Sequence, residues 1–133
     1  MKKITLLALG ILGFSVQAAE PLKALLITGG CCHDYTKQKT IISQGVSKRA
    51  NVSWTILHEG GTGRTHRFSI YQKKDWIKDF DVVVHNECFG AIGDKAFVEG
   101  IATAHRDSGV PAVVLHCTMH SYRAADKITD EWR

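Results

Sequence analysis

The sequence lacks a hydrophobic run long enough to span a membrane. Its longest apolar stretch, residues 4–16, has 13 residues, whereas a membrane-spanning helix needs roughly 20. Lys2 and Lys3 precede this stretch, and Val16 and Ala18 follow as small residues at the positions that a signal peptidase reads. The pattern predicts a signal peptide over residues 1–18 and an exported bacterial protein, periplasmic or secreted. No stable membrane insertion is expected once the peptide is removed.

Blocks of one charge, internal repeats and low-complexity tracts are also missing. Lys2 and Lys3 are two of the 17 basic residues, which leaves 15 basic against 13 acidic residues in the mature chain. A net charge near +2 gives no reason to expect nucleic acid or an anionic membrane as a partner. The remaining length suits one small domain, which we expect over residues 22–133.

Two common motifs of catalytic sites are absent. No HExxH zinc motif occurs, and the glycine-rich stretch of residues 58–66 lacks the lysine and the following Ser or Thr of a phosphate-binding loop. That stretch is either a mobile flap over a site or a solvated connector. Cysteines are too few for a cysteine-rich scaffold in a chain whose core is rich in Val, Ile and Leu. Their pairing stays open; they are Cys31, Cys32, Cys88 and Cys117.

Hydrophobic patterning predicts strands and helices in alternation. Short continuous apolar runs suit strands that are buried on both faces. Segments with apolar residues on one side suit helices that cover a sheet. The order strand, helix, strand, short helix, strand, helix, strand predicts a doubly wound parallel α/β sheet. The expected strands cover residues 23–28, 52–57, 81–85 and 112–115, and the expected helices cover residues 35–49, 71–80 and 93–107.

Polar residues follow three of these strands. In parallel sheets, ligands bind beyond the carboxyl ends of the strands, beside the point where strand order reverses. The first strand leads to His33 and Asp34, the third to residues 85–87, and the fourth to residues 116–123. We therefore expect one ligand pocket at this edge of the sheet.

The same segments resemble the ThuA-like family of the trehalose-utilisation type, a relative of the class I glutamine amidotransferase fold. The resemblance is carried by Ile27-Thr-Gly-Gly30 with His33-Asp34, by Val84-His-Asn-Glu87, by Leu115-His116 with His120-Ser-Tyr-Arg123, and by residues 129–133 as a helix start. It implies a flavodoxin-like three-layer sandwich, associated with carbohydrate use, of which this chain is the N-terminal part. Glutamine amidotransferase activity is not expected, because the neighbours of Cys117 are His116 and Thr118 instead of small residues.

One hypothesis for the pocket is a metal-dependent, hydrolase-like site. Imidazoles and carboxylates are suitable zinc ligands, and a catalytic zinc needs three protein ligands and an open position. His116 and His120 are four residues apart and would share one face of a helix. Together with His33 they are the predicted ligands of a divalent metal such as zinc.

A second hypothesis is metal-free acid/base chemistry on a carbohydrate or a sugar-derived carbonyl compound, and a third is a binding module without catalysis. In the second, His116, His120 and Glu87 are the catalytic residues that exchange protons. Both need ligand-binding residues on the same edge. These are Gly29, Gly30, His33, Asp34, Asn86, Tyr122 and Arg123.

Structural roles remain open for several of these residues. His33 and Asp34 could cap the following helix and do nothing more. His85 could bond within the end of the sheet, and His66 and His105 are expected to face solvent.

Overall fold

The computed structural model describes residues 19–125. The predicted signal peptide of residues 1–18 and the predicted helix start at residues 129–133 lie outside the described residues. Within residues 19–125, no helix has the length and apolar character needed to cross a membrane.

Four parallel strands form the centre of the fold in the order β2-β1-β3-β4. Their bounds are β1 (Leu22–Gly30), β2 (Val52–His58), β3 (Val82–Cys88) and β4 (Ala112–Val114). This is the order in which flavodoxin-like sheets begin, with the reversal of strand order between β1 and β3. The predicted α/β class with a parallel sheet is confirmed.

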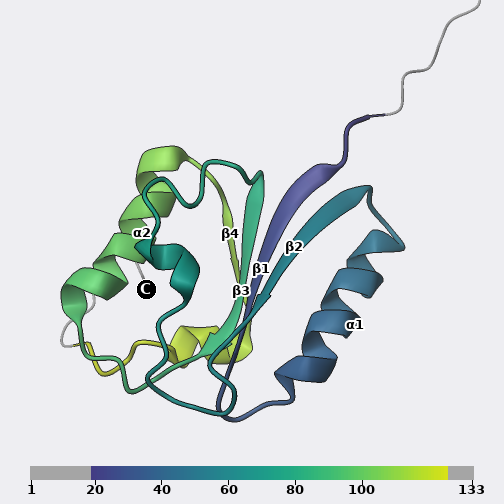
Figure 1. Cartoon of the computed structure of the whole chain (residues 1–133). Helices are drawn as coiled ribbons and strands as arrows, with labels where there is room; N and C mark the ends of the chain where they lie inside the picture. The colour runs from purple at the N-terminus through teal and green to yellow at the C-terminus, as the bar shows by residue number, and fades with distance from the viewer. Residues whose placement is uncertain (1–18, 126–133) are drawn as a thin grey trace, which may run out of the picture.

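Two helices cover opposite faces of this sheet, which gives three layers (Figure 1). Helix α1 (Tyr35–Ser47) begins after Asp34, whose side chain accepts from the backbone N–H of Lys37. Helix α2 (Lys95–Ser108) ends at Gly109 in the left-handed conformation, where glycine has no Cβ to clash. The arrangement is consistent with part of a flavodoxin-like sandwich.

One predicted helix is not formed as expected. Over residues 71–80 the structure has the end of the 3-10 helix η1 (Ser69–Gln72), followed by turns. Lys73 is extended and Asp75 has a φ of 56°, and neither conformation can continue a helix. Trp76 and Ile77 nevertheless pack against the core, as their spacing indicates.

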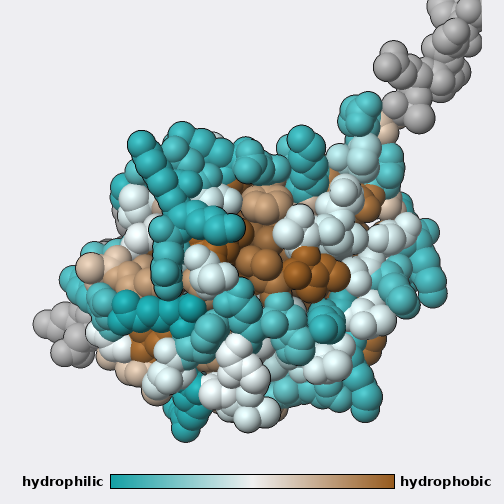
Figure 2. Space-filling view, viewed as in Figure 1, coloured by the Kyte–Doolittle hydropathy of each residue, from teal (hydrophilic) through white to brown (hydrophobic). Residues whose placement is uncertain are grey.

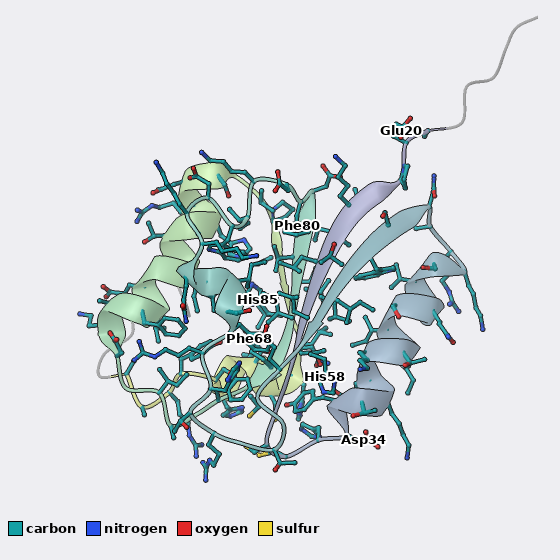
Figure 3. All side chains as sticks on the ribbon, in the orientation of Figure 1. Glu20, Asp34, His58, Phe68, Phe80 and His85 are labelled. Atoms are coloured by element: carbon teal, nitrogen blue, oxygen red, sulfur yellow. The ribbon has the colours of Figure 1, made fainter. Side chains whose placement is uncertain are left out.

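The core lies between the sheet and α2. Neighbouring residues of a strand point to opposite faces, so Leu25, Ile27 and Val83 share the face that α2 covers. Phe68 and His85 also lie between the sheet and α2 (Figure 3). Figure 2 shows a group of hydrophobic side chains, in brown, in the middle of the face viewed there.

The other face of the sheet is only partly covered. Helix α1 packs on β1 and β2, and an apolar groove of about 570 Å³ remains beside it. Val84 and Val113 line this groove, and Val113 on the edge strand β4 is 44% exposed.

Candidate functional site

The carboxyl ends of β1, β3 and β4 bring side chains from three parts of the chain to one rim. After β1 come the turn residues 31–34, and after β4 the 3-10 helix η2 (His116–His120) begins. The register pairs Gly30 of β1 with Cys88 of β3. The expected meeting of segments at the strand ends is therefore present, and it lies where strand order reverses.

The first group of side chains, the imidazole–thiol cluster, consists of His33, His116 and Cys117. The Nε2 of His33 lies 2.9 Å from the Sγ of Cys117, and the rings of His33 and His116 are 5.2 Å apart. One possible ligand atom from each residue lies within 4.8 Å of the others. Both histidines are exposed and Cys117 is half-buried, so this cluster faces solvent.

The backbone of His116 is part of this arrangement. Its φ is 31°, a left-handed conformation that is uncommon for residues other than glycine. Such conformations concentrate where a side chain is held in place for a function. His116 is the first residue of η2, shortly after the end of β4.

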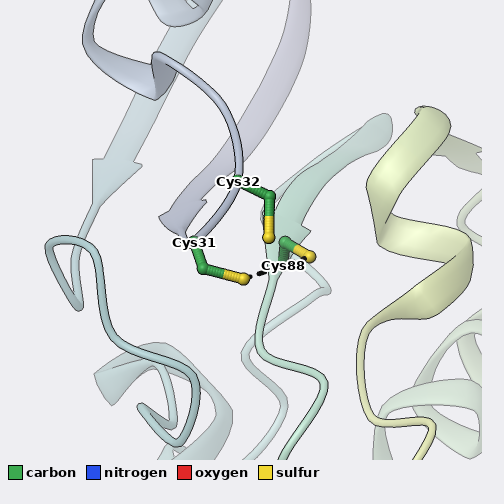
Figure 4. A group of neighbouring side chains, drawn as sticks. All are labelled: Cys31, Cys32 and Cys88. Carbon is green, nitrogen blue, oxygen red and sulfur yellow. Dashed lines mark hydrogen bonds between the residues drawn. The ribbon is translucent and has the colours of Figure 1, made fainter.

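The second group, the three-cysteine cluster, consists of Cys31, Cys32 and Cys88. The side chains of Cys31 and Cys32, just after β1, point toward Cys88 at the end of β3 (Figure 4). The Sγ atoms of Cys31 and Cys88 are 3.9 Å apart, and all three sulfur atoms lie within 4.8 Å of one another. All four cysteines are free thiols in this structure.

Comparisons with known proteins assign no family. No family model, no curated protein and no solved structure matches this chain.

Gly29 and Gly30 have a structural role in forming the rim. Gly29 has a φ of 147°, and a Cβ added there would lie 2.0 Å from the carbonyl oxygen of Glu59. Gly30 has a φ of 103°, and a Cβ added there would lie 2.3 Å from the carbonyl oxygen of Cys88. Both glycines thus allow other backbone segments to approach β1. They were predicted to allow a ligand to approach, and the space beside them is filled by the protein itself.

Glu87, one of the predicted catalytic residues, is fully buried on the α2 face. Its Oε1 accepts from the hydroxyls of Tyr71 at 3.2 Å and Tyr122 at 3.3 Å, and lies 3.0 Å from the Nδ1 of His85. The structure places this carboxylate beneath the rim instead of among the exposed histidines. Tyr122, predicted to orient a ligand, is likewise fully buried.

The buried network extends to α2 through two histidines. The Nδ1 of His105 donates to the carbonyl oxygen of Val110 at 2.7 Å, so its Nε2 is the acceptor when the ring is neutral. The Nε2 of His85 then donates to it at 3.0 Å, while the Nδ1 of His85 faces Glu87. Burial, aided by the neighbouring His85, lowers the pKa of His105. The expectation that His105 faces solvent was wrong.

Two further predicted ligand residues make contacts within the protein. The amide of Asn86 donates to the hydroxyl of Thr28 at 3.2 Å and to Gln38 at 3.1 Å. Asp34 caps α1, and the backbone N–H of Lys37 lowers the pKa of its carboxyl. The capping role left open for Asp34 is thus present, while its side chain remains half exposed.

His120 and Arg123 are exposed at the end of η2 and just beyond it. The structure groups His33 and His116 with Cys117 and does not include His120. The reason is the helix type. A 3-10 helix has three residues per turn, so residues four apart do not share a face as they do in an α-helix. The sequence feature that could have identified Cys117 as a member of this cluster is its position directly after His116.

The glycine-rich loop of residues 58–66 is fastened to the same rim. Its Gly61 carbonyl accepts from the N–H of Gly30 at 3.0 Å. Glu59 accepts from the hydroxyl of Ser69 and bonds to His66, whose side chain is 36% exposed and thus faces solvent in part. Burial raises the pKa of Glu59, but these hydrogen bonds outweigh it and lower the pKa on balance.

Two imidazoles and a thiolate are a suitable ligand set for zinc and related transition metals. Tetrahedral coordination would place the nitrogen of His33 and the sulfur of Cys117 roughly 3.5 Å apart. The observed 2.9 Å is close to this value and requires only a small opening. The imidazole–thiol cluster therefore has the donor types, the spacing and the solvent access of a metal site with an open position.

Proposed function

We propose that this protein is an exported ThuA-like domain that binds a carbohydrate or a sugar-derived ligand at the carboxyl ends of its strands. In this proposal His33, His116 and Cys117 hold a divalent transition metal, and the ligand binds beside it. The observation that supports it most is the approach of these three donor groups to within 4.8 Å of one another at an exposed rim.

The metal would supply a Lewis-acidic position for a hydroxyl, carbonyl or carboxylate oxygen. Three protein ligands leave the fourth tetrahedral position open, and the exposure of His33 and His116 leaves room for a ligand there. Asp34, His120 and Arg123 are exposed on the adjoining segments. Their side chains can bond to sugar hydroxyl and carboxylate groups.

A metal-dependent hydrolase is the second candidate, and the open coordination position favours it. Catalytic zinc sites have three protein ligands, whereas structural sites have four. Such a reaction needs a general base near the metal. In this chain that base would be His120, since Glu87 is buried and bonded to two tyrosines.

The binding proposal is tested by titrating the reduced full-length chain with neutral and acidic monosaccharides, in the presence and absence of zinc, by calorimetry. We expect saturable binding that requires zinc and is lost in His33→Ala and His116→Ala. Arg67→Ala is the matched control, because Arg67 is exposed and pairs with Asp94 away from both clusters. Sugar binding that is equal with and without zinc would contradict the metal-dependent part, and no binding of any sugar would contradict the ligand class.

Turnover separates the two candidates. If the site is hydrolytic, zinc-loaded protein cleaves chromogenic sugar esters or glycosides, and His120→Ala lowers kcat while zinc affinity stays unchanged. A protein that binds sugars without cleaving any of them is a binding module.

A further inference from the structure

The three-cysteine cluster has the geometry of a second metal site. Around a tetrahedral zinc ion with bonds of about 2.3 Å, neighbouring sulfur atoms lie roughly 3.8 Å apart. The Sγ atoms of Cys31 and Cys88 already lie at 3.9 Å, and Cys32 completes a triangle within 4.8 Å. A soft cation could therefore bind with little movement of these side chains.

The backbone holds this triangle together. The N–H of Cys31 donates to the carbonyl oxygen of Cys88 at 3.2 Å, which ties the ends of β1 and β3. Cys32 has a φ of 87°, which is uncommon for a residue with a side chain. In this conformation Cys32 points its sulfur toward the other two (Figure 4).

Tyr35 provides an independent sign of a missing partner. Its side chain is only 3% exposed, and its hydroxyl has no hydrogen bond of good geometry to any described residue. Burial raises the pKa of Tyr35, and the neighbouring thiols of Cys88 and Cys117 raise it further. A thiol is a weak acceptor, whereas a thiolate is a strong one. A metal ion bound to Cys88 would turn this neighbouring thiol into a thiolate and so offer the hydroxyl an acceptor.

The thiols do not all ionise easily by themselves. The hydrogen bond with Cys32 lowers the pKa of Cys31 and raises that of Cys32, while burial raises the pKa of Cys88 to about 12. A dication reverses this preference, because a coordinating thiol is deprotonated by the metal charge.

We propose that Cys31, Cys32 and Cys88 bind a thiophilic dication of the zinc and cadmium class as three thiolates, at a site distinct from the imidazole–thiol cluster. On binding, the S–H bonds of the protonated thiols break, up to three protons pass to solvent, and three metal–sulfur bonds form. No electron is transferred. Because Cys32 is exposed, the fourth position is open to water. The site does not depend on the function proposed above.

The test uses Cd²⁺ and the reduced, metal-free full-length chain that carries His33→Ala and His116→Ala. This background removes two donors of the other cluster and keeps all four thiols. We expect one Cd²⁺ per chain, with the ultraviolet charge-transfer band of three cadmium–thiolate bonds. Cys32→Ser in this background should weaken binding by more than about a hundredfold, beyond the range typical of changes around a metal site. Arg67→Ala, the control on an exposed residue that belongs to neither cluster, should leave affinity within about threefold of the background, inside ordinary context-dependent variation of such a site.

Three outcomes would overturn the proposal: no charge-transfer band in the background variant, unchanged affinity in Cys32→Ser, or equal losses in Cys32→Ser and Arg67→Ala. Cys32 is exposed, so its substitution leaves the core intact, and circular dichroism verifies the fold. Failure of the function proposed above gives a different result. In that case the wild type binds no more Cd²⁺ than the background variant, whose own band is unaffected.

Discussion

Substitution of Glu87 by alanine is expected to destabilise the fold, because this carboxylate is the acceptor at the centre of a buried network. It is fully buried, its Oε1 accepts from the hydroxyls of Tyr71 and Tyr122, and the Nδ1 of His85 lies 3.0 Å from the same oxygen. Leaving a buried hydrogen-bond donor without its acceptor costs about 1–3 kcal/mol. Its Oε2 is buried without a partner among the described residues, which already costs some stability. Because both tyrosine hydroxyls lose this acceptor, we expect a loss near the upper end, about 3 kcal/mol.

Urea denaturation followed by tryptophan fluorescence measures this loss. Glu87→Gln should lose less than Glu87→Ala, because its amide oxygen still accepts from the tyrosines. The matched control is Glu99→Ala on α2, where the pair with Lys95 at 3.4 Å is partly exposed and contributes about 0–1 kcal/mol. If Glu87→Ala unfolds within about 1 kcal/mol of the wild type, the network is not a stabilising element. An intact fold that loses only ligand turnover would restore the predicted catalytic role.

Three other changes test the fold around the site. Asp94→Ala removes the side chain that caps α2 and should cost about 1 kcal/mol in urea denaturation; an unchanged midpoint would contradict the capping role. Gly30→Ala introduces a Cβ 2.3 Å from the carbonyl oxygen of Cys88 at a φ of 103° and should cost more than about 2 kcal/mol, whereas Gly45→Ala, with open space around it, should be neutral or stabilising. Equal effects of the two glycine changes would refute this. The pKa of His105 is lowered from an ordinary 6.5, so the unfolded chain takes up the proton first, and stability should fall as pH drops below 6.5 toward the folded-state pKa. His105→Gln should flatten this slope between pH 7 and 5, and an unchanged slope would contradict it.

Much of the sheet could be predicted because buried parallel strands leave a clear signal. The apolar runs at Leu25 and Val83 and the stop at Gly109 predicted β1, β3 and the end of α2 in nearly their observed places. The short helix over residues 71–80 could not be predicted correctly, because the left-handed conformation of Asp75 depends on tertiary packing that sequence periodicity does not report.

The candidate site was predicted in its location and only partly in its members. Strand order places His33 and His116 at one rim, and the structure agrees. Glu87 points beneath the rim because it lies on the face of β3 that α2 covers. The sheet register, which pairs Gly29 with Glu87 and Ile27 with His85, puts it on the same face as Ile27. Cys117, and not the predicted His120, joins the two histidines because η2 is a 3-10 helix. The prediction of His120 assumed an α-helix in this segment.

The central claim is that His33, His116 and Cys117 bind a transition metal. X-ray absorption at the zinc edge tests it most directly, on the full-length Cys32→Ser variant loaded with one zinc ion per chain, in which the three-cysteine cluster is weakened. We expect two imidazole nitrogens at about 2.0–2.1 Å and one sulfur at about 2.3 Å, with a light atom in the remaining position. A zinc shell without sulfur, or a chain that retains no zinc, would contradict the claim.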